Sequence, residues 1–145
     1  MSETLLYKGD CLVEMNKIAD KSVDMILCDL PYEIVNQKWD KIIPFDKLWG
    51  QYKRIIKDKG AIVLFGQEPF SSKLRCSNLE WYRYDWIWDK THCSNFQVMN
   101  YQCGRQHELI LCSVKVRLVI QVTTHQCIII HRKQKEINLY EMVVD

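Results

Sequence analysis

A tetrapeptide with the chemistry to hold a flat, amino-bearing ring follows an apolar run in this sequence. Asp29-Leu30-Pro31-Tyr32 comes directly after residues 23–28. The Asp29 carboxylate and the backbone carbonyls beside Pro31 can accept hydrogen bonds from amino protons, while the face of Tyr32 can stack on the ring. Proline fixes φ and removes a backbone donor, so these acceptors stand in a stiff geometry. The tetrapeptide therefore predicts a site for a nucleobase that carries an amino group.

Apolar runs and helix-spaced apolar residues alternate along the first part of the chain. The predicted strands are residues 5–7, 23–28, 61–65, 82–88 and 109–114. The predicted helices are residues 11–20, 46–59, which Gly60 would end, and 69–78. Alternation of strand and helix with short connections predicts a parallel α/β sheet with right-handed crossovers.

Polar residues end three of the predicted strands. Asp10, Asp29 and Gly66-Gln67 each follow a strand at its carboxyl end. Because ligands of open α/β sheets bind outside the carboxyl ends of the strands, we expect these residues to lie at one edge and to form a site.

Composition sets broad limits on the function. The 145 residues fit one domain, and 48% apolar with 26% charged residues is typical of a folded chain. A net charge of +2 does not by itself indicate a nucleic-acid partner. Basic residues cluster at 53–59 and 132–135, and such clusters are more often solvated faces than phosphate contacts.

The cysteines and histidines do not form a metal motif. The seven cysteines are odd in number, include no CxxC pair, and show no ligand spacing with the four histidines. No signal peptide and no apolar stretch near 18 residues is visible, so we expect a cytoplasmic chain with reduced thiols and no membrane partner.

Taken in order, the motifs resemble those of the amino-group DNA methyltransferases, which modify adenine N6 or cytosine N4. The resemblance is carried by residues 6–11 (LYKGDC), Ser22-Val23-Asp24, the tetrapeptide at 29–32 and the segments that follow, up to about residue 92. Their order is similar to the permuted class, in which the catalytic motif precedes the cofactor motif. The resemblance implies a partial Rossmann-like methyltransferase sheet, mostly parallel, with helices on both faces.

The resemblance also implies roles for individual residues. Asp29 and the backbone carbonyl between Leu30 and Pro31 would accept hydrogen bonds from the amino group of a flipped-out base in DNA, and Tyr32 would stack on that base. The methyl donor would be S-adenosylmethionine, placed in line with the target nitrogen, so that orientation supplies most of the acceleration. Asp10 would bind the adenine amino group of the cofactor, and Cys11 would offer its backbone amide beside it.

Three departures from the family pattern concern Leu30, Glu33 and the glycines. Leu30 stands where a second proline is common, and Glu33 where glycine is usual. The last 41 residues contain no glycine, although the permuted order places a glycine-rich cofactor turn near that end. We therefore divide the chain into a partial catalytic domain (1–115) and an atypical tail (116–145) of the kind a frame-shifted or truncated gene would give. A second chain or a missing C-terminal segment would then complete the cofactor site.

Other interpretations of the same residues stay open. Asp10 could be a helix N-cap, Asp29 a turn former, and Tyr32 an ordinary half-buried aromatic. The tryptophans at 81, 86 and 88 are more often core than a stacking platform. A phosphate-loop nucleotide hydrolase is disfavoured because no Gly-Lys-Ser/Thr loop is present. The second function to weigh is a non-catalytic nucleic-acid-binding remnant of a methyltransferase.

Overall fold

The computed structural model describes residues 5–93 and 95–115 with their side chains, and residues 126–133 and 136–143 as backbone. Within these residues one seven-stranded sheet is accompanied by α-helices and short 3-10 helices. The strands are β1 (Leu6–Gly9), β2 (Val23–Asp29), β3 (Ile56–Gly66), β4 (Tyr82–Asp89), β5 (His107–Val114), β6 (Gln126–Lys133) and β7 (Glu136–Val143). The helices are α1 (Cys11–Glu14), η1 (Met15–Lys17), α2 (Phe45–Ile55), α3 (Phe70–Ser77) and η2 (Phe96–Val98).

The strands lie in the order β1-β7-β6-β2-β3-β5-β4. Strand β2 pairs in parallel with both β3 and β6. The pairs β1·β7, β6·β7, β3·β5 and β4·β5 are antiparallel. The α/β class is confirmed, but the prediction of a mostly parallel sheet is wrong, because antiparallel neighbours outnumber parallel ones among the described strands.

The connections explain the strand directions. A parallel neighbour needs a crossover of about a dozen residues or more, commonly a helix. Strand β2 reaches β3 through α2, which is such a crossover. Strand β4 reaches β5 through residues 90–106, whose described part contains only the short η2, and β6 reaches β7 across two residues. Neither of the last two connections carries a crossover helix, so β5 and β7 return antiparallel beside their predecessors.

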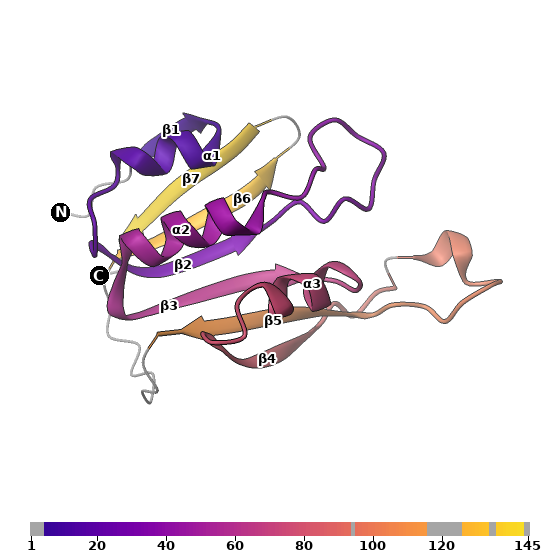
Figure 1. Ribbon diagram of the computed structural model, residues 1–145. Helices are drawn as coiled ribbons and strands as arrows, with labels where there is room; N and C mark the ends of the chain where they lie inside the picture. The colour runs from indigo at the N-terminus through magenta and orange to yellow at the C-terminus, as the bar shows by residue number, and fades with distance from the viewer. Residues whose placement is uncertain (1–4, 94, 116–125, 134–135, 144–145) are drawn as a thin grey trace.

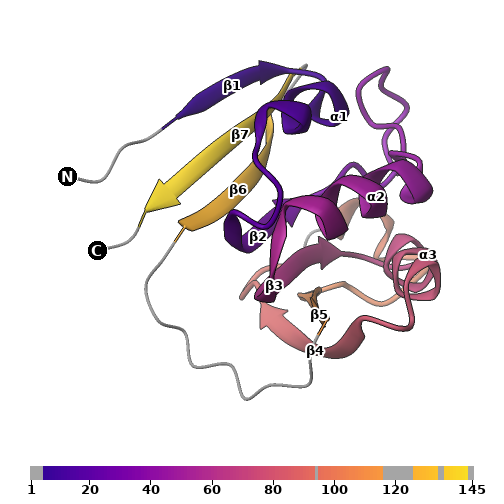
Figure 2. The same ribbon diagram turned by 60° about the vertical axis from the view of Figure 1, so that its left-hand side comes forward.

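Helices α1, η1, α2 and α3 cover the same face of the sheet, as Figures 1 and 2 show. One hydrophobic cluster joins them to the strands. Its fully buried members include Met15 of η1, Tyr52 of α2, Phe70 of α3, Ile26 of β2 and Ile62 of β3. Burying each such side chain contributes roughly 1.5–3 kcal/mol. The expected helices on both faces are therefore found on one face of the described part.

The opposite face of the sheet carries an apolar cluster built from strands alone. Val63 of β3 with Cys112 and Val114 of β5 form its buried part, and Met25 and Leu27 of β2 pack against them. Among the described residues no helix contributes to this cluster. The apolar residues on both faces of β2 suggested helices on both sides, but here strand neighbours alone bury much of their surface.

Helix α2 ends at Ile55, earlier than the predicted residue 59. The following residues belong to β3, whose register against β2 shifts at this point. A Cβ on Gly60 would lie 2.8 Å from the backbone oxygen of Asp24, closer than real Cβ atoms come to their neighbours. Gly60 is therefore required by the close approach of two strands and does not act as a helix stop.

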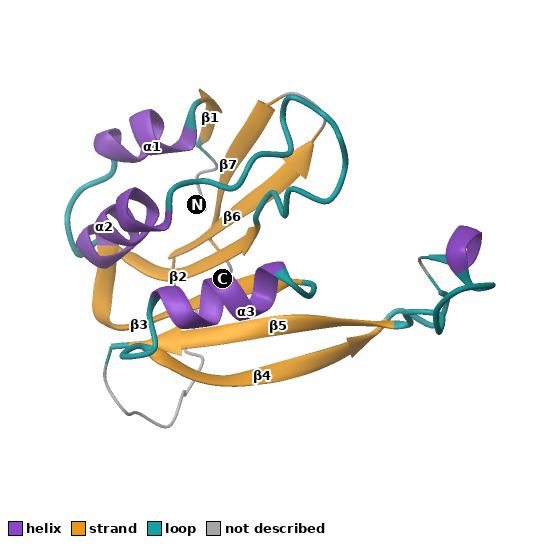
Figure 3. Cartoon of the chain, turned by 45° about the vertical axis from the view of Figure 1, so that its right-hand side comes forward, coloured by secondary structure: helices purple, strands orange, loops and turns teal. Residues whose placement is uncertain are grey.

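The connection between β4 and β5 projects from the body of the molecule as an arm (Figures 1 and 3). Phe96 and Tyr101 on this arm are 68% and 91% exposed. On β4, Trp86 and Trp88 are about half exposed, whereas Trp81 before the strand is buried. The interpretation of the tryptophans as core therefore holds for Trp81 alone.

The tail contributes to the same sheet. The apolar residues 127–131 of the tail fall within β6, whereas the apolar residues 116–122 lie outside the described residues. Strands β6 and β7 fill the positions between β1 and β2. None of the described helices is long and apolar enough to cross a membrane.

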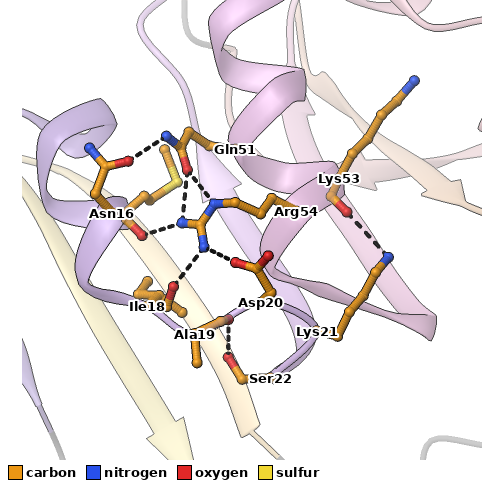
Figure 4. A network of polar contacts seen from close by, with 10 residues as sticks. Asn16, Ile18, Ala19, Asp20, Lys21, Ser22, Gln51, Lys53 and Arg54 are labelled. Carbon is orange, nitrogen blue, oxygen red and sulfur yellow. Dashed lines mark hydrogen bonds and ion pairs between the residues drawn. The ribbon is translucent and has the colours of Figure 1, made fainter.

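Arg54 of α2 ties this helix to the turn before β2 (Figure 4). Its guanidinium donates to the carbonyl oxygens of Ile18 (2.8 Å) and Met15 (2.7 Å) and pairs with Asp20. The side-chain oxygen of Gln51 accepts two further bonds, at 3.1 and 2.9 Å. The planar fork of arginine suits this arrangement, because several donors reach different acceptors at once.

Other members of the basic cluster at 53–59 also contact the protein. The Nζ atom of Lys57 lies 2.7 Å from the carboxylate of Asp24. The Nζ atom of Lys53 lies 5.0 Å from the centre of the Trp81 ring, a cation–π distance. These contacts give the cluster a structural function in holding α2 and the start of β3.

Replacing Arg54 by methionine should lower the free energy of unfolding by about 2–3 kcal/mol, because two backbone acceptors lose their donors and an ion pair is removed. Urea unfolding followed by circular dichroism measures this loss. Lys59→Met, at an exposed position in the same basic cluster, is the matched control and should change stability by less than about 0.5 kcal/mol. Equal stability of the two variants would show that the Arg54 contacts do not stabilise the fold.

Candidate functional site

Asp29 is the last residue of β2, the strand flanked by parallel neighbours on both sides. It pairs in register with Phe65 near the end of β3. The carboxyl ends of β6, β2 and β3 therefore lie at one edge of the sheet, which is where open α/β sheets bind their ligands. The position predicted for Asp29 from the sequence is the one the structure gives it.

The Tyr32 side chain folds back and contacts the last residue of β2. Its hydroxyl oxygen lies 2.7 Å from Oδ1 of Asp29 and 2.9 Å from Oε1 of Glu108 on β5. Its ring stacks on Phe70 of α3, with the ring centres 4.9 Å apart and the planes at 29°. The side chain is 7% exposed, so both the hydroxyl and the ring are engaged inside the protein.

The burial of Tyr32 keeps its hydroxyl protonated. Burial is the largest cause that raises the pKa of Tyr32 far above its ordinary value, and the neighbouring carboxylates of Asp29 and Glu108 raise it further. The phenol therefore stays neutral and can act as a hydrogen-bond donor at any ordinary pH.

Glu108 and Lys90 extend this contact, and no site role was predicted for either. Glu108 is 9% exposed and forms an ion pair with Lys90, which follows β4. The Nζ atom of Lys90 also lies 5.4 Å from the centre of the Trp88 ring. The signal in the sequence was a lone carboxylate at the start of an apolar strand, but its partners are far away along the chain.

Leu30 and Pro31 follow β2 directly, and both are buried. Leu30 packs within the main hydrophobic cluster. An apolar side chain at this position therefore anchors the tetrapeptide in the core, while the predicted use of its backbone carbonyl stays a prediction.

A buried carboxylate holds the residues after Pro31. Asp40 is 1% exposed, and its two oxygens accept hydrogen bonds from four successive backbone amides. The donors and distances are Tyr32 (3.0 Å), Glu33 (3.1 Å), Ile34 (2.8 Å) and Val35 (2.7 Å). Amide bonds to a charged acceptor are roughly twice as strong as neutral ones, so this single side chain fixes the course of the loop.

Glu33 adopts the backbone conformation that glycine favours. Its φ is 59°, in the left-handed region. A residue with a Cβ pays roughly 1–2 kcal/mol there relative to glycine. The glycine that is usual at this position in the family therefore has a conformational reason, and the departure at Glu33 leaves local strain in the loop.

Asp10 and Cys11 follow β1 and begin α1. The Oδ1 atom of Asp10 accepts a hydrogen bond from the amide of Leu12 at 2.8 Å, so Asp10 is the N-cap of α1. Cys11 is buried, and burial raises the pKa of its thiol to about 11. Strand β1 runs in the same direction as β2, so Asp10 and Asp29 lie at the same edge, but β7 and β6 separate them.

Gly66 also ends its strand at this edge, but for a packing reason. A Cβ on Gly66 would lie 2.9 Å from a methyl group of Leu111 and 3.1 Å from Cβ of Ser71 in α3. The absence of a side chain lets α3 approach the end of β3. Helix α3 in turn carries Phe70, on which Tyr32 stacks.

Comparison with known proteins shows which proteins the chain is similar to. No protein-family model matches it. It is 29% identical over 135 residues to the type II methyltransferase M.HinfI of Haemophilus influenzae and 30% identical over 83 residues to the type II methyltransferase M2.MboI of Moraxella bovis. The chain thus resembles the DNA amino-methyltransferases in sequence.

The fold is similar to that of solved DNA methyltransferases. The cytosine-N4-specific PvuII DNA methyltransferase superposes with a TM-score of 0.60 at 11% identity, and the M1.HpyAVI–SAM complex with 0.56 at 16% identity. These matches cover 76% and 81% of this chain. They cover 48% and 58% of the two solved chains. The two curated alignments cover 74% and 42% of this chain but only 37% and 30% of the relatives.

The described residues of this methyltransferase relative fit only one end of S-adenosylmethionine. Asp10 offers an acid at the correct edge, although its side chain already caps α1. The strand beside β2 is β6, and it turns back into β7 with Lys133 opposite Glu136. Residues 126–143 contain no glycine, so this part of the chain offers no glycine-rich turn of the kind that would receive the methionine part. The residues present therefore do not fit the whole cofactor.

Replacing Asp40 by asparagine should destabilise the protein by about 3 kcal/mol, because one acceptor oxygen is exchanged for an NH₂ group that faces amide donors. The loop should also become a protease substrate at the exposed Lys38. Urea unfolding and limited trypsin digestion measure the two effects. Asp46→Asn, at an exposed position in the first turn of α2, is the control and should change neither by much. Unaltered digestion of the Asp40 variant would exclude a loop-anchoring role.

Replacing Glu33 by glycine should leave stability unchanged or raise it by up to about 1 kcal/mol, because relief of the left-handed strain exceeds or offsets the added freedom of the unfolded chain. The same change at Lys38, an exposed loop residue whose φ is not positive, should cost about 0.5–1 kcal/mol. Thermal unfolding of both variants compares the two sites. A larger loss at residue 33 than at residue 38 would contradict the strained conformation.

Proposed function

We propose that the chain provides the target-base site of a S-adenosylmethionine-dependent DNA methyltransferase that acts on an exocyclic amino group, with adenine N6 as the first target to test and cytosine N4 as the second. The observation that carries this proposal is the Asp29 carboxylate at the carboxyl end of the central parallel strand, in contact with the hydroxyl of Tyr32. A carboxylate held at this edge can accept a hydrogen bond from an amino group without moving. DNA would be the partner.

The four residues of the tetrapeptide have distinct functions in this proposal. Asp29 accepts a hydrogen bond from the amino group, and the backbone carbonyl of Leu30 beside the rigid Pro31 accepts a second. Both bonds hold the nitrogen with its lone pair directed away from the acceptors, which is the orientation that methyl transfer requires. Tyr32 would stack on the base after its ring leaves Phe70.

S-adenosylmethionine would supply the methyl group that is transferred. Asp10 and the backbone amide of Cys11 are the proposed contacts for the adenine end of the cofactor. The methionine end needs a glycine-rich turn that residues 126–143 do not contain. We propose that a second chain provides that turn, so that the active enzyme has two parts.

A second candidate function is a nucleic-acid-binding remnant without catalysis. The β6–β7 hairpin beside β2 favours it, because a hairpin of this kind gives the methionine part of the cofactor no receiving turn. Under this alternative the base site still binds DNA, and no methyl transfer follows even when other chains are added.

Cofactor and DNA binding to the whole chain separate the two candidates. Titration calorimetry with S-adenosylmethionine measures cofactor uptake, and fluorescence anisotropy with a short oligonucleotide measures DNA binding at stated salt concentrations. Salt-dependent DNA binding supports both candidates. Transfer of a labelled methyl group to adenine or cytosine, after addition of a chain with the glycine-rich turn, supports the enzyme. Absence of transfer in such a mixture, with DNA still bound, supports the remnant.

Replacing Asp29 by asparagine should weaken binding of a single-stranded oligonucleotide with one adenine about tenfold, because a charged acceptor for the amino group is lost. Anisotropy at fixed salt concentration measures the dissociation constant. Asp46→Asn should bind like the unmodified chain, since Asp46 lies in the exposed first turn of α2. Equal affinity of the Asp29 variant and the unmodified chain would show that the base site is elsewhere.

A further inference from the structure

The loop that follows the tetrapeptide carries two exposed apolar side chains, Ile34 and Val35, which we call the apolar pair. They are 52% and 46% exposed. Their loop joins β2 to α2, and in Figure 1 it projects beyond the carboxyl end of β2, where Asp29 lies. Single exposed apolar residues are common on protein surfaces, so exposure alone indicates no function. The surroundings of the pair are what point to one.

The backbone beneath the apolar pair is fixed from the inside of the protein. The amides of Ile34 and Val35 donate to Oδ2 of the buried Asp40 at 2.8 and 2.7 Å. The carbonyl oxygen of Val35 accepts a hydrogen bond from the amide of Gln37 at 2.7 Å. These bonds use backbone atoms only, so they hold the loop whatever side chains the pair carries. The pair is thus an exposed feature on a well-anchored backbone.

The side-chain types of the loop suit contact with nucleic acid. Isoleucine and valine are branched at Cβ and stiff at χ1, so they lose little rotamer freedom when a contact immobilises them. Proteins insert apolar side chains such as isoleucine between DNA bases as wedges. The exposed charges of residues 33–41 are the cations of Lys38 and Lys41 and the acid of Glu33. Cations therefore outnumber the acid beside the pair, which favours a polyanion as the partner.

A base that reaches Asp29 must first leave the stack of a duplex. Turning the nucleotide outward costs unstacking and unpairing energy and leaves a gap between the neighbouring bases. An apolar side chain in this gap removes the exposed faces of those bases from water, and so offsets part of the cost. The side chain that fills the gap has to lie close to the base site, and the apolar pair begins two residues after Tyr32.

We propose that the apolar pair enters the DNA stack and fills the gap left by the flipped-out base, while Lys38 and Lys41 contact the phosphates beside it. Ile34 and Val35 are then positioning residues, because they hold the base outside the duplex and do not touch the reacting atoms. The step involves no covalent bond. This inference rests on the proposed function, since the gap forms when a base enters the site at Asp29.

The test compares a DNA that has a gap in its stack with one that has no second strand. The first probe is a short duplex in which one nucleotide lacks its base. The second is the single-stranded oligonucleotide with one adenine. Anisotropy at fixed salt concentration gives the affinity of the whole chain for each probe.

The double variant Ile34→Ala/Val35→Ala should bind the gapped duplex about tenfold more weakly, because two apolar side chains no longer fill the gap. Its affinity for the single strand should change by less than about twofold, since phosphate contacts and stacking at the base site are left in place. Alanine retains both backbone amides, so the bonds to Asp40 remain and the loop keeps its course. Circular dichroism checks that the variant folds.

Two control variants accompany the double variant. Ile34→Leu keeps an apolar side chain of the same volume and should bind both probes like the unmodified chain. Leu79→Ala removes a side chain that is 64% exposed, in the turn between α3 and β4 and outside the loop of the apolar pair. It should leave both affinities unchanged.

The outcomes separate this inference from the proposed function. If the unmodified chain binds neither probe, both are overturned. If Asp29→Asn weakens single-strand binding but the double variant binds the gapped duplex normally, the base site stands and the inference is overturned. An equal loss on both probes also overturns it, because gap filling requires a stack. A lower sedimentation coefficient of the double variant would assign the pair to contact between copies of the chain and overturn the inference as well.

Discussion

The site depends on the carboxylate of Asp40, which accepts the amides of residues 32–35. These bonds fix the backbone directly after Pro31, and they therefore determine the position of the Tyr32 backbone, from which its side chain extends. From that start the ring reaches Phe70 and the hydroxyl reaches Asp29 and Glu108. One buried side chain thus links the loop, the helix α3 and the strands β2 and β5. Without it, no other described contact would hold the four amides together.

The direction of the strands sets what the site can and cannot do. Parallel pairing of β2 with β3 and β6 places Asp29 at an edge shared by three strand ends. The same edge on the β6 side is closed by a hairpin, since β7 returns antiparallel. The edge at β2 and β3 is therefore built from well-packed elements, whereas the described residues on the β6 side contain no glycine. This asymmetry follows from connection lengths, because a two-residue link permits only an antiparallel return.

Local features of the sequence predicted much of the fold but few of the contacts between the residues of the site. Hydrophobic periodicity located the strands and helices up to β5, and the tetrapeptide placed Asp29 correctly at the end of β2. The sequence did not reveal that Glu108 would meet Tyr32, because 76 residues separate them and nothing local reports the contact. It also missed Asp40, whose role depends on a loop conformation. Gly60 was misread as a helix stop because a close approach between strands leaves no local pattern.

The internal position of Tyr32 follows from electrostatics as much as from packing. Two carboxylates directed at one point in a buried site repel each other and lose their hydration unless a donor lies between them. Lys90 pairs with one oxygen of Glu108, and the other oxygen faces the Tyr32 hydroxyl. The chain must therefore bring a donor of its own, and the loop held by Asp40 delivers the Tyr32 hydroxyl.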